Sequence, residues 1–175
     1  DNVWLATRTD LFRMSLQTPS VLKRFELDSL GIKCRVTKII ESTDGLVYIA
    51  TLGNGLRVYD YSSDKLTAYT METNDLLSNY CYNLAVSPRD NLLITSDKGV
   101  SLFSPLTKSI HSIKLGLKGG ISAISDGCGI FVSRDEQIFI GGVDGMAAFR
   151  EEDLYMDRDD KDEFYFSDLY LSLIH

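Results

Sequence analysis

Histidine is scarce in this chain of 175 residues, since only His111 and His175 are present. The sequence also lacks the Gly-x-Ser-x-Gly, His-Glu-x-x-His and P-loop motifs of nucleophilic, metal-assisted and phosphate chemistry. Proton transfer and nucleophilic attack near neutral pH rely heavily on such groups. We therefore expect no catalytic residue, no metal site and no cofactor, and we do not expect this chain to be an enzyme.

Cysteine is also rare. Cys34, Cys81 and Cys128 follow one another at equal intervals of 47 residues. If they occupy equivalent points of neighbouring repeats, their Cα atoms lie beyond the roughly 7 Å that a disulfide allows. The odd number and the absence of a Cys-x-x-Cys motif argue against a disulfide framework or a zinc site. We predict three buried free thiols.

Positive charge is in deficit, with 18 lysines and arginines against 25 aspartates and glutamates and a net charge of -7. Nucleic-acid surfaces need clustered basic residues, so we expect no contact with nucleic acid. No apolar run approaches the roughly 18 residues of a membrane span, and no signal-peptide pattern is present. The chain starts in the middle of a sequence repeat, so we expect it to be a piece of a longer protein.

The chain does contain short apolar segments separated by turn residues. Between Val36 and Tyr69, such segments are divided by Asp44-Gly45 and by Gly53-Asn54-Gly55. Spacings of this kind suit short antiparallel strands joined by tight turns. This stretch therefore predicts a β-meander.

The same unit recurs along the whole chain. Matching positions lie 44, 45 and 46 residues apart, at Trp4, Tyr48, Leu93 and Phe139. A period of about 40 to 50 residues with four short strands is typical of β-propeller blades, which bury both faces only by stacking on neighbours. We predict an all-β chain that forms a partial β-propeller of about 3.5 four-stranded blades.

These repeats set the expected domain organisation. We expect an incomplete blade, two full blades, a closing blade, an acidic linker and the first strand of another domain, at 1–28, 29–75, 76–118, 119–154, 155–163 and 164–175. The acidic run from Glu151 to Glu163 could hold calcium, but a solvated linker fits its spacing better. The glycine-rich approach at 116–129 is long enough for a mobile surface loop. Asp10 stands where the other units carry glycine, so this turn must be closed without a residue free to take a positive φ, although aspartate tolerates that conformation better than most residues.

One known repeat resembles this unit. The two-component regulator propeller repeat shares the pattern Val36-x-x-Ile39-x-x-x-x-Asp44-Gly45-x-x-Tyr48-Ile49-x-Thr51-x-x-Asn54-Gly55-Leu56-x-x-Tyr59-Asp60. It occurs in the periplasmic sensor region of hybrid two-component proteins, above all those of Bacteroidetes. Residues 139–149 look like the closing blade of such a sensor, and residues 166–171 resemble the strand that enters its membrane-proximal immunoglobulin-like domain.

The resemblance implies a parent protein with two seven-bladed propellers, an immunoglobulin-like stalk, a membrane helix, a histidine kinase, a receiver and an AraC-type DNA-binding domain. This chain would be the end of the second propeller and the start of the stalk. It would lie in the periplasmic part of an inner-membrane protein that forms a homodimer. The kinase histidine would lie outside the chain, so neither His111 nor His175 takes that role.

Ligand contacts are expected where turns and strand connections project from one face of the ring. Planar hydrogen-bonding groups and aromatic rings suit sugar hydroxyls and uronates. The candidate ligand-binding residues are Arg8, Arg35, Asn54, Tyr80, Tyr82, Lys98 and Asp144. Asn54 also has a purely structural interpretation as a turn former, and one of the two alternating tyrosines should point between blades. Five other aromatic residues are expected to pack between blades: Trp4, Tyr48, Tyr59, Phe103 and Phe149.

The favoured function is a sensor that binds an oligosaccharide released from a complex glycan and signals across the membrane to a phosphorelay and transcription. Two alternatives stay open. The blades could bind a partner polypeptide as a scaffold, or they could form a propeller lyase or hydrolase, which needs a histidine and a carboxylate near the axis. An incomplete ring leaves open sheet edges, so we also expect self-association.

Overall fold

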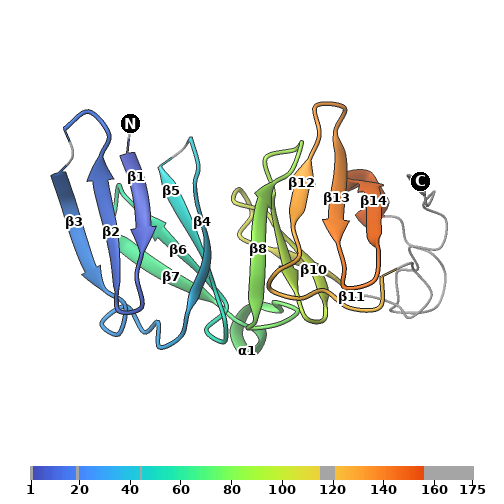
Figure 1. Cartoon of the computed structure of the whole chain (residues 1–175), viewed down its shortest axis with the longest axis horizontal. Coiled ribbons are helices and arrows are strands. Elements are labelled where there is room, and N and C mark those ends of the chain that lie inside the picture. Colours follow the sequence, from blue (N-terminus) through green and yellow to red (C-terminus); the bar gives the residue numbers. More distant parts are fainter. Residues whose placement is uncertain (1, 19, 44, 115–120, 156–175) are drawn as a thin grey trace.

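The computed structural model describes residues 2–18, 20–43, 45–114 and 121–155 of the chain. Four antiparallel β-sheets follow one another along the sequence and stand in a row, from blue to orange in Figure 1. Hydrogen-bonded neighbours in each sheet are consecutive in sequence, as in a meander. The prediction of an all-β chain built from repeated antiparallel units is confirmed.

The strands are short, with three to seven residues each. The first sheet contains β1 (Asn2–Ala6), β2 (Asp10–Ser15) and β3 (Ser20–Glu26), and the second contains β4 (Val36–Glu41), β5 (Leu46–Thr51), β6 (Leu56–Asp60) and β7 (Lys65–Tyr69). The third contains β8 (Cys81–Val86), β9 (Leu92–Ser96), β10 (Gly99–Phe103) and β11 (Ile110–Lys114), and the fourth contains β12 (Ile130–Val132), β13 (Gln137–Gly141) and β14 (Met146–Arg150). The described helices are α1 (Met71–Asn74) and the 3-10 helix η1 (Glu151–Tyr155).

Neighbouring sheets pack face to face through alternating side chains. In β5, Val47 and Ile49 join a cluster with Leu11 of the first sheet, whereas Tyr48 packs with Phe103 of the third. Successive side chains of a strand point to opposite faces, so a strand between two sheets is apolar at nearly every position. This explains why the apolar runs of β5 and β9 are continuous and almost wholly buried.

The aromatic residues expected between sheets are found there. Tyr48, Tyr59, Phe103 and Phe149 are at most 6% exposed. Trp4 is half-buried, and its ring contacts those of Phe25, Tyr59 and Tyr61 with centroid distances of 5.7 to 6.1 Å. The prediction for these five residues is confirmed.

The first strands of the second, third and fourth sheets lie next to one another. Thr37 in β4 donates a hydrogen bond of 2.7 Å to the carbonyl oxygen of Cys81, and Asn83 in β8 donates one of 3.5 Å to that of Cys128. The pairing of β4 with β5 shifts at Thr37, and that of β8 with β9 shifts at Tyr82. Such bulges re-aim nearby side chains, and here they bring polar groups against the next sheet.

Asp10 does not have a positive φ, so the turn before β2 closes without one, as expected. The Thr7 hydroxyl oxygen accepts a hydrogen bond from the Asp10 amide at 3.0 Å, which closes the turn. The Asp10 carboxylate is buried and accepts hydrogen bonds from Arg24 Nε at 2.8 Å and from the Thr9 hydroxyl at 2.7 Å. This residue therefore ties β2 to β3.

Replacing Asp10 with asparagine should make the stability of the chain less dependent on acid pH. The Arg24 guanidinium and the Thr9 hydroxyl hold the pKa of the Asp10 carboxyl below its ordinary value. A carboxyl of this kind stabilises the fold above its unfolded pKa of about 3.9 and loses that effect as the pH falls through the folded pKa. We expect Asp10→Asn to melt at a lower temperature than the native chain near pH 7, and the gap to close below about pH 4. A gap in thermal unfolding that stays constant to about pH 3 would contradict this.

All three cysteines are free, as predicted, but only Cys81 is buried. Cys34 and Cys128 are half-buried, so the prediction of buried thiols is wrong for them. The three cysteines are equally spaced in the sequence but do not occupy equivalent places in the sheets. Cys81 is the first residue of β8, whereas the other two precede β4 and β12. Burial raises the pKa of the Cys81 thiol to about 12, so this thiol is protonated and unreactive at neutral pH.

Two further expectations hold only in part near the fourth sheet. Ile121 and Ile124 are 2% and 3% exposed and belong to the core cluster of the third and fourth sheets, so residues 121–124 are anchored in the core, whereas exposed residues of the expected surface loop lie at 126–129. Glu151 begins the acidic run but is 3% exposed, because it anchors η1 instead of facing solvent. Residues 115–120, most of the expected linker at 155–163 and the expected strand at 164–175 lie outside the described residues.

Candidate functional site

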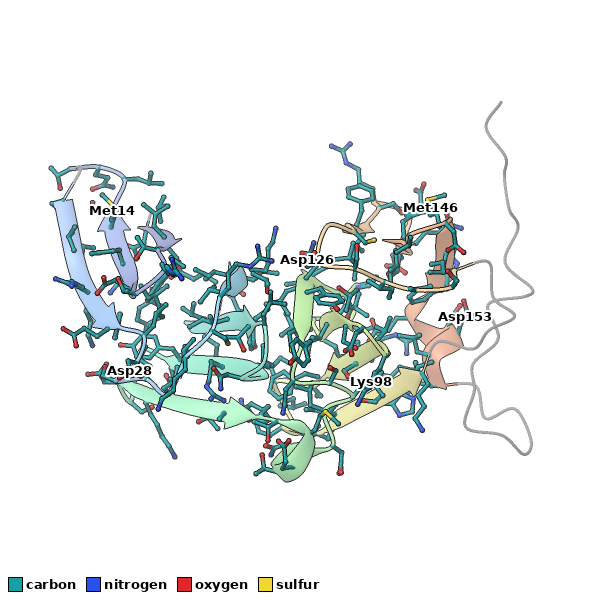
Figure 2. The ribbon with its side chains drawn as sticks, turned by 60° about the horizontal axis from the view of Figure 1, so that its bottom comes forward. Met14, Asp28, Lys98, Asp126, Met146 and Asp153 are labelled. Atoms are coloured by element: carbon teal, nitrogen blue, oxygen red, sulfur yellow. The ribbon has the colours of Figure 1, made fainter. Side chains whose placement is uncertain are left out.

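Side chains from three sheets meet near the starts of β4 and β8. Arg35, just before β4, forms an ion pair with Asp126, in the loop before β12, although 91 residues separate them. Both side chains are more than 40% exposed, at 61% and 47%, so the pair faces solvent. Figure 2 shows Asp126 in the middle of the molecule.

Two tyrosines are connected with this ion pair: Tyr82 interacts electrostatically with Asp126, and Tyr80 is linked to Arg35 through the backbone of Leu52. Tyr80 is 53% exposed, and its backbone forms an isolated bridge with Leu52. Tyr82 is half-buried and packs against the core cluster of the third and fourth sheets. Tyr82 therefore points between sheets and Tyr80 points to solvent, as predicted, because Tyr80 precedes β8 and the pairing of β8 with β9 shifts at Tyr82.

Acidic groups surround Tyr82. Burial raises the pKa of its phenol, and the carboxylates of Asp97 and Asp126 raise it further. The phenol therefore stays protonated at neutral pH and can donate a hydrogen bond. We call Arg35, Tyr80, Tyr82, Asp97 and Asp126 the leading-strand cluster, because they lie around the first strands of three sheets. Such a set of planar polar and aromatic groups can bind a ligand rich in hydroxyls.

The side chains of Asn54 and Asp144 hold loops of this chain in place through hydrogen bonds. The Asn54 side-chain oxygen accepts hydrogen bonds from the Lys33 amide and the Cys34 thiol, both at 2.9 Å. The Asp144 carboxylate accepts one from the Ser122 amide at 2.9 Å, which lowers the pKa of Asp144. Ligand contact by either residue stays a prediction.

Arg8 lies in another sheet than the leading-strand cluster, and Lys98 follows Asp97 but directs its side chain to α1. Arg8 is exposed in the turn between β1 and β2 of the first sheet. Lys98 is exposed between β9 and β10, and its Nζ lies 3.8 Å from the sulfur of Met71 in α1. The structure thus brings together three of the seven predicted site residues, Arg35, Tyr80 and Tyr82.

No family model matches the sequence, and no curated protein matches it. Solved structures with a similar fold are found by comparing the structure. The extracellular domain assigned to a hybrid two-component system of Bacteroides thetaiotaomicron superposes with a TM-score of 0.66 at 15% identity, over 92% of this chain and 20% of that one. A second such domain from this organism gives 0.64 at 16% identity, over 87% of this chain and 22% of the other. This chain shares its fold with extracellular domains of hybrid two-component systems.

A further structure from this organism, assigned to a one-component system, gives a TM-score of 0.65 at 13% identity over 94% of this chain and 21% of that one. The three solved chains are all extracellular domains. This chain spans about a fifth of their length. At these identities the likeness concerns the fold alone.

Sequence reasoning missed two residues of this region. Asp126 stands in the approach to β12 much as Arg35 stands in the approach to β4, and this parallel was the available signal. Arg57 in β6 is 8% exposed, and its Nη2 donates a hydrogen bond of 3.2 Å to the carbonyl oxygen of Gly31. Burial lowers the pKa of Arg57, which lies near the thiols of Cys34 and Cys81. A buried cation therefore lies close to the leading-strand cluster.

Across the described residues, no group of three or more histidine, cysteine, aspartate or glutamate side chains is placed to hold a metal ion. No described helix has both the length and the apolar character needed to cross a membrane.

Proposed function

We propose that this chain is an extracytoplasmic ligand-sensing segment of a hybrid two-component sensor histidine kinase. The four sheets would be consecutive blades at the end of a seven-bladed β-propeller, and residues 164–175 would open an immunoglobulin-like stalk. The parent would be a periplasm-facing inner-membrane protein whose kinase lies outside this chain. Support comes from the likeness to extracellular domains of hybrid two-component systems and from the row of stacked antiparallel sheets.

The leading-strand cluster is the observation on which the proposal depends. Its residues come from three successive sheets and stand where loops leave a rigid scaffold, which is where ligand sites are common. Arg35 and Asp126 already join the second and fourth sheets across the start of β8. A ligand that binds one arrangement of these sheets better than another would shift the population toward it, and a signal requires such a difference.

The ligand class we propose is an oligosaccharide derived from a complex glycan. Tyr80 offers an exposed aromatic face for a sugar ring, and Arg35, Asp97 and Asp126 offer charged partners for its hydroxyls. With the nearby Arg57, two guanidinium groups stand against two carboxylates at the leading-strand cluster, so its charges balance and suit a neutral oligosaccharide.

Replacing Tyr80 with alanine should weaken oligosaccharide binding by about tenfold or more, equivalent to ~1.4 kcal/mol, because the stacking face is lost. Calorimetric titration with neutral and acidic oligosaccharides from plant, host and microbial glycans measures this. Tyr155→Ala is a matched control, since Tyr155 is similarly exposed at 49% against 53% but lies in η1. Equal losses in both variants would contradict a site at the leading-strand cluster, and no binding across the panel would contradict the ligand class.

A protein-interaction role is the second candidate, supported by exposed apolar side chains on the two end sheets: Leu5, Val21 and Leu22 on the first, and Phe131 and Met146 on the fourth. Exposed apolar surface marks interaction sites, and we propose that further blades or a second copy of the chain cover it. A lyase or hydrolase has less support, because His111 lies on β11 with its Nε2 2.9 Å from the carbonyl oxygen of Leu154.

A further inference from the structure

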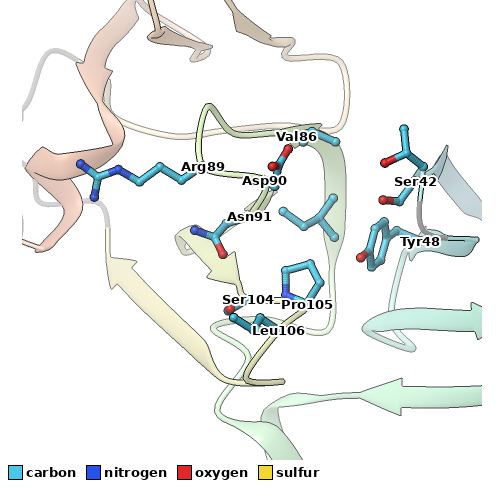
Figure 3. Close-up of a pocket in the computed structure, with 11 residues that line it drawn as sticks. Ser42, Tyr48, Val86, Arg89, Asp90, Asn91, Ser104, Pro105 and Leu106 are labelled. Atoms are coloured by element: carbon cyan, nitrogen blue, oxygen red, sulfur yellow. The ribbon is translucent and has the colours of Figure 1, made fainter.

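A groove of about 530 Å³ opens between the second and third sheets, at the end of β8 away from the leading-strand cluster. Ser42, Thr43 and Tyr48 line it on the second sheet, and Asn91 and Pro105 line it on the third. Figure 3 shows Ser42 and Tyr48 on one side of the opening and Asp90 and Pro105 on the other, with the Asn91 amide turned away from the groove. Small-molecule sites typically measure about 300 to 1,000 Å³, so the groove is large enough for one.

The lining of the groove combines hydroxyl and amide groups with apolar surface. Val86 and Leu106 are exposed at its rim, at 42% and 91%, and Leu92 is buried. Of the two charged residues of the lining, Arg89 extends toward Glu152, so the Asp90 carboxylate is the charged group that faces the groove. A carboxylate and neutral polar groups beside apolar surface suit an uncharged molecule that presents both hydroxyls and C–H faces.

The third-sheet wall of the groove is also bonded to η1. Asn91 Nδ2 donates a hydrogen bond of 2.6 Å to one carboxylate oxygen of Glu151, and the Arg89 amide donates one of 3.1 Å to the other. The Arg89 side chain extends away from the groove in Figure 3, and its guanidinium lies 3.5 Å from the carboxylate of Glu152. The turn between β8 and β9 therefore touches the groove on one side and η1 on the other.

The far end of η1 rests on β11. His111 Nε2 lies 2.9 Å from the carbonyl oxygen of Leu154, and the His111 ring stacks on Tyr155 with a centroid distance of 5.6 Å. Leu154 is buried in the core cluster of the third and fourth sheets. Because η1 is a single short turn held at both ends by the third sheet, a change in the β8–β9 turn reaches it directly.

We infer that this groove is a second binding site, for a small neutral molecule with several hydroxyl groups, and that its occupancy changes how firmly η1 is held. A ligand between Ser42 and Asp90 would order the β8–β9 turn and tighten its two hydrogen bonds to Glu151. The inference that a ligand binds here rests on the groove alone. The use of η1 as an output rests on the proposed sensor function, because η1 leads toward residues 156–175.

The test titrates the intact chain with maltose, cellobiose and lactose by saturation-transfer NMR, and saturable binding is the expected result. Val86→Trp fills the groove from an exposed position and should weaken this binding by about tenfold or more. Leu16→Trp is the matched control, since Leu16 is 60% exposed and belongs to none of the proposed binding surfaces, and it should bind like the native chain. Tyr80→Ala, which removes the proposed stacking face of the leading-strand cluster, should keep the binding that Val86→Trp loses, and this separates the two sites.

Hydrogen–deuterium exchange of peptides that cover Glu151–Tyr155 measures whether ligand binding in the groove changes how firmly η1 is held. A saturating disaccharide should slow this exchange by about threefold or more in the native chain and in Leu16→Trp, but not in Val86→Trp. Three results would overturn the inference: no binding of any of the three sugars, binding lost in Tyr80→Ala but kept in Val86→Trp, or unchanged exchange at saturation. Failure of oligosaccharides to bind the leading-strand cluster would leave the groove result standing.

Discussion

Gly55→Ala should lower the free energy of unfolding by about 3 to 5 kcal/mol, because two penalties meet at one position. Gly55 has a φ of +74° in the turn between β5 and β6, in the left-handed region that side chains disfavour. An added Cβ would lie 2.3 Å from the carbonyl oxygen of Tyr69. That oxygen cannot retreat cheaply, since Tyr69 pairs with Leu56 in the ladder between β6 and β7. Urea-induced unfolding measures the loss.

Two other glycines separate the penalties. Gly31 has a φ of +68° with open space around it, so Gly31→Ala should show only the backbone strain, about 1 to 2 kcal/mol. Gly129 has no atom within 4 Å of an added Cβ and no positive φ, so Gly129→Ala should change stability by about 0.5 kcal/mol or less. If Gly55→Ala matched Gly31→Ala, the contact with Tyr69 would contribute nothing.

Local patterns in the sequence were enough to place the strands of the second sheet. Turn glycines and apolar runs predicted β5 and β6, and the structure has them at Leu46–Thr51 and Leu56–Asp60. These signals are short-range, because alternation and turn chemistry depend on neighbouring residues. The repeat spacing then predicted several such units in succession, since one sheet cannot bury both faces alone.

Contacts between loops could not be predicted in this way. The ion pair of Arg35 with Asp126 joins segments 91 residues apart, and the similar positions of these residues before β4 and β12 do not reveal that their side chains meet. Glu151 looked like one more acid in a charged run, yet its carboxylate is buried against the turn that holds Asn91. Acidic residues are usually exposed, so a charged run in the sequence predicts exposure for each of its members. Whether one of them is buried depends on a hydrogen-bond partner far away in the sequence.

The strand β8 connects the two candidate sites. Tyr82 lies near its start in the leading-strand cluster, and Val86 lies at its end beside the groove. Its residues also bond the neighbouring sheets, through Cys81 toward β4 and Asn83 toward β12. A ligand at either end therefore acts on the same strand, and from it on the β8–β9 turn that holds η1.

Glu151→Ala should detach η1 and lower the free energy of unfolding by about 2 to 4 kcal/mol, because it leaves the Arg89 amide and the Asn91 side chain without their buried acceptor. Glu152→Ala is the matched control in the same helix. Its carboxylate is 55% exposed and lies 3.5 Å from an exposed guanidinium, so about 0.5 kcal/mol or less is expected. Denaturant unfolding measures the energies, and hydrogen exchange at Glu151–Tyr155 should rise by about tenfold or more only in Glu151→Ala. Equal effects of the two substitutions would mean that η1 is held by packing of Leu154 and not by the buried carboxylate.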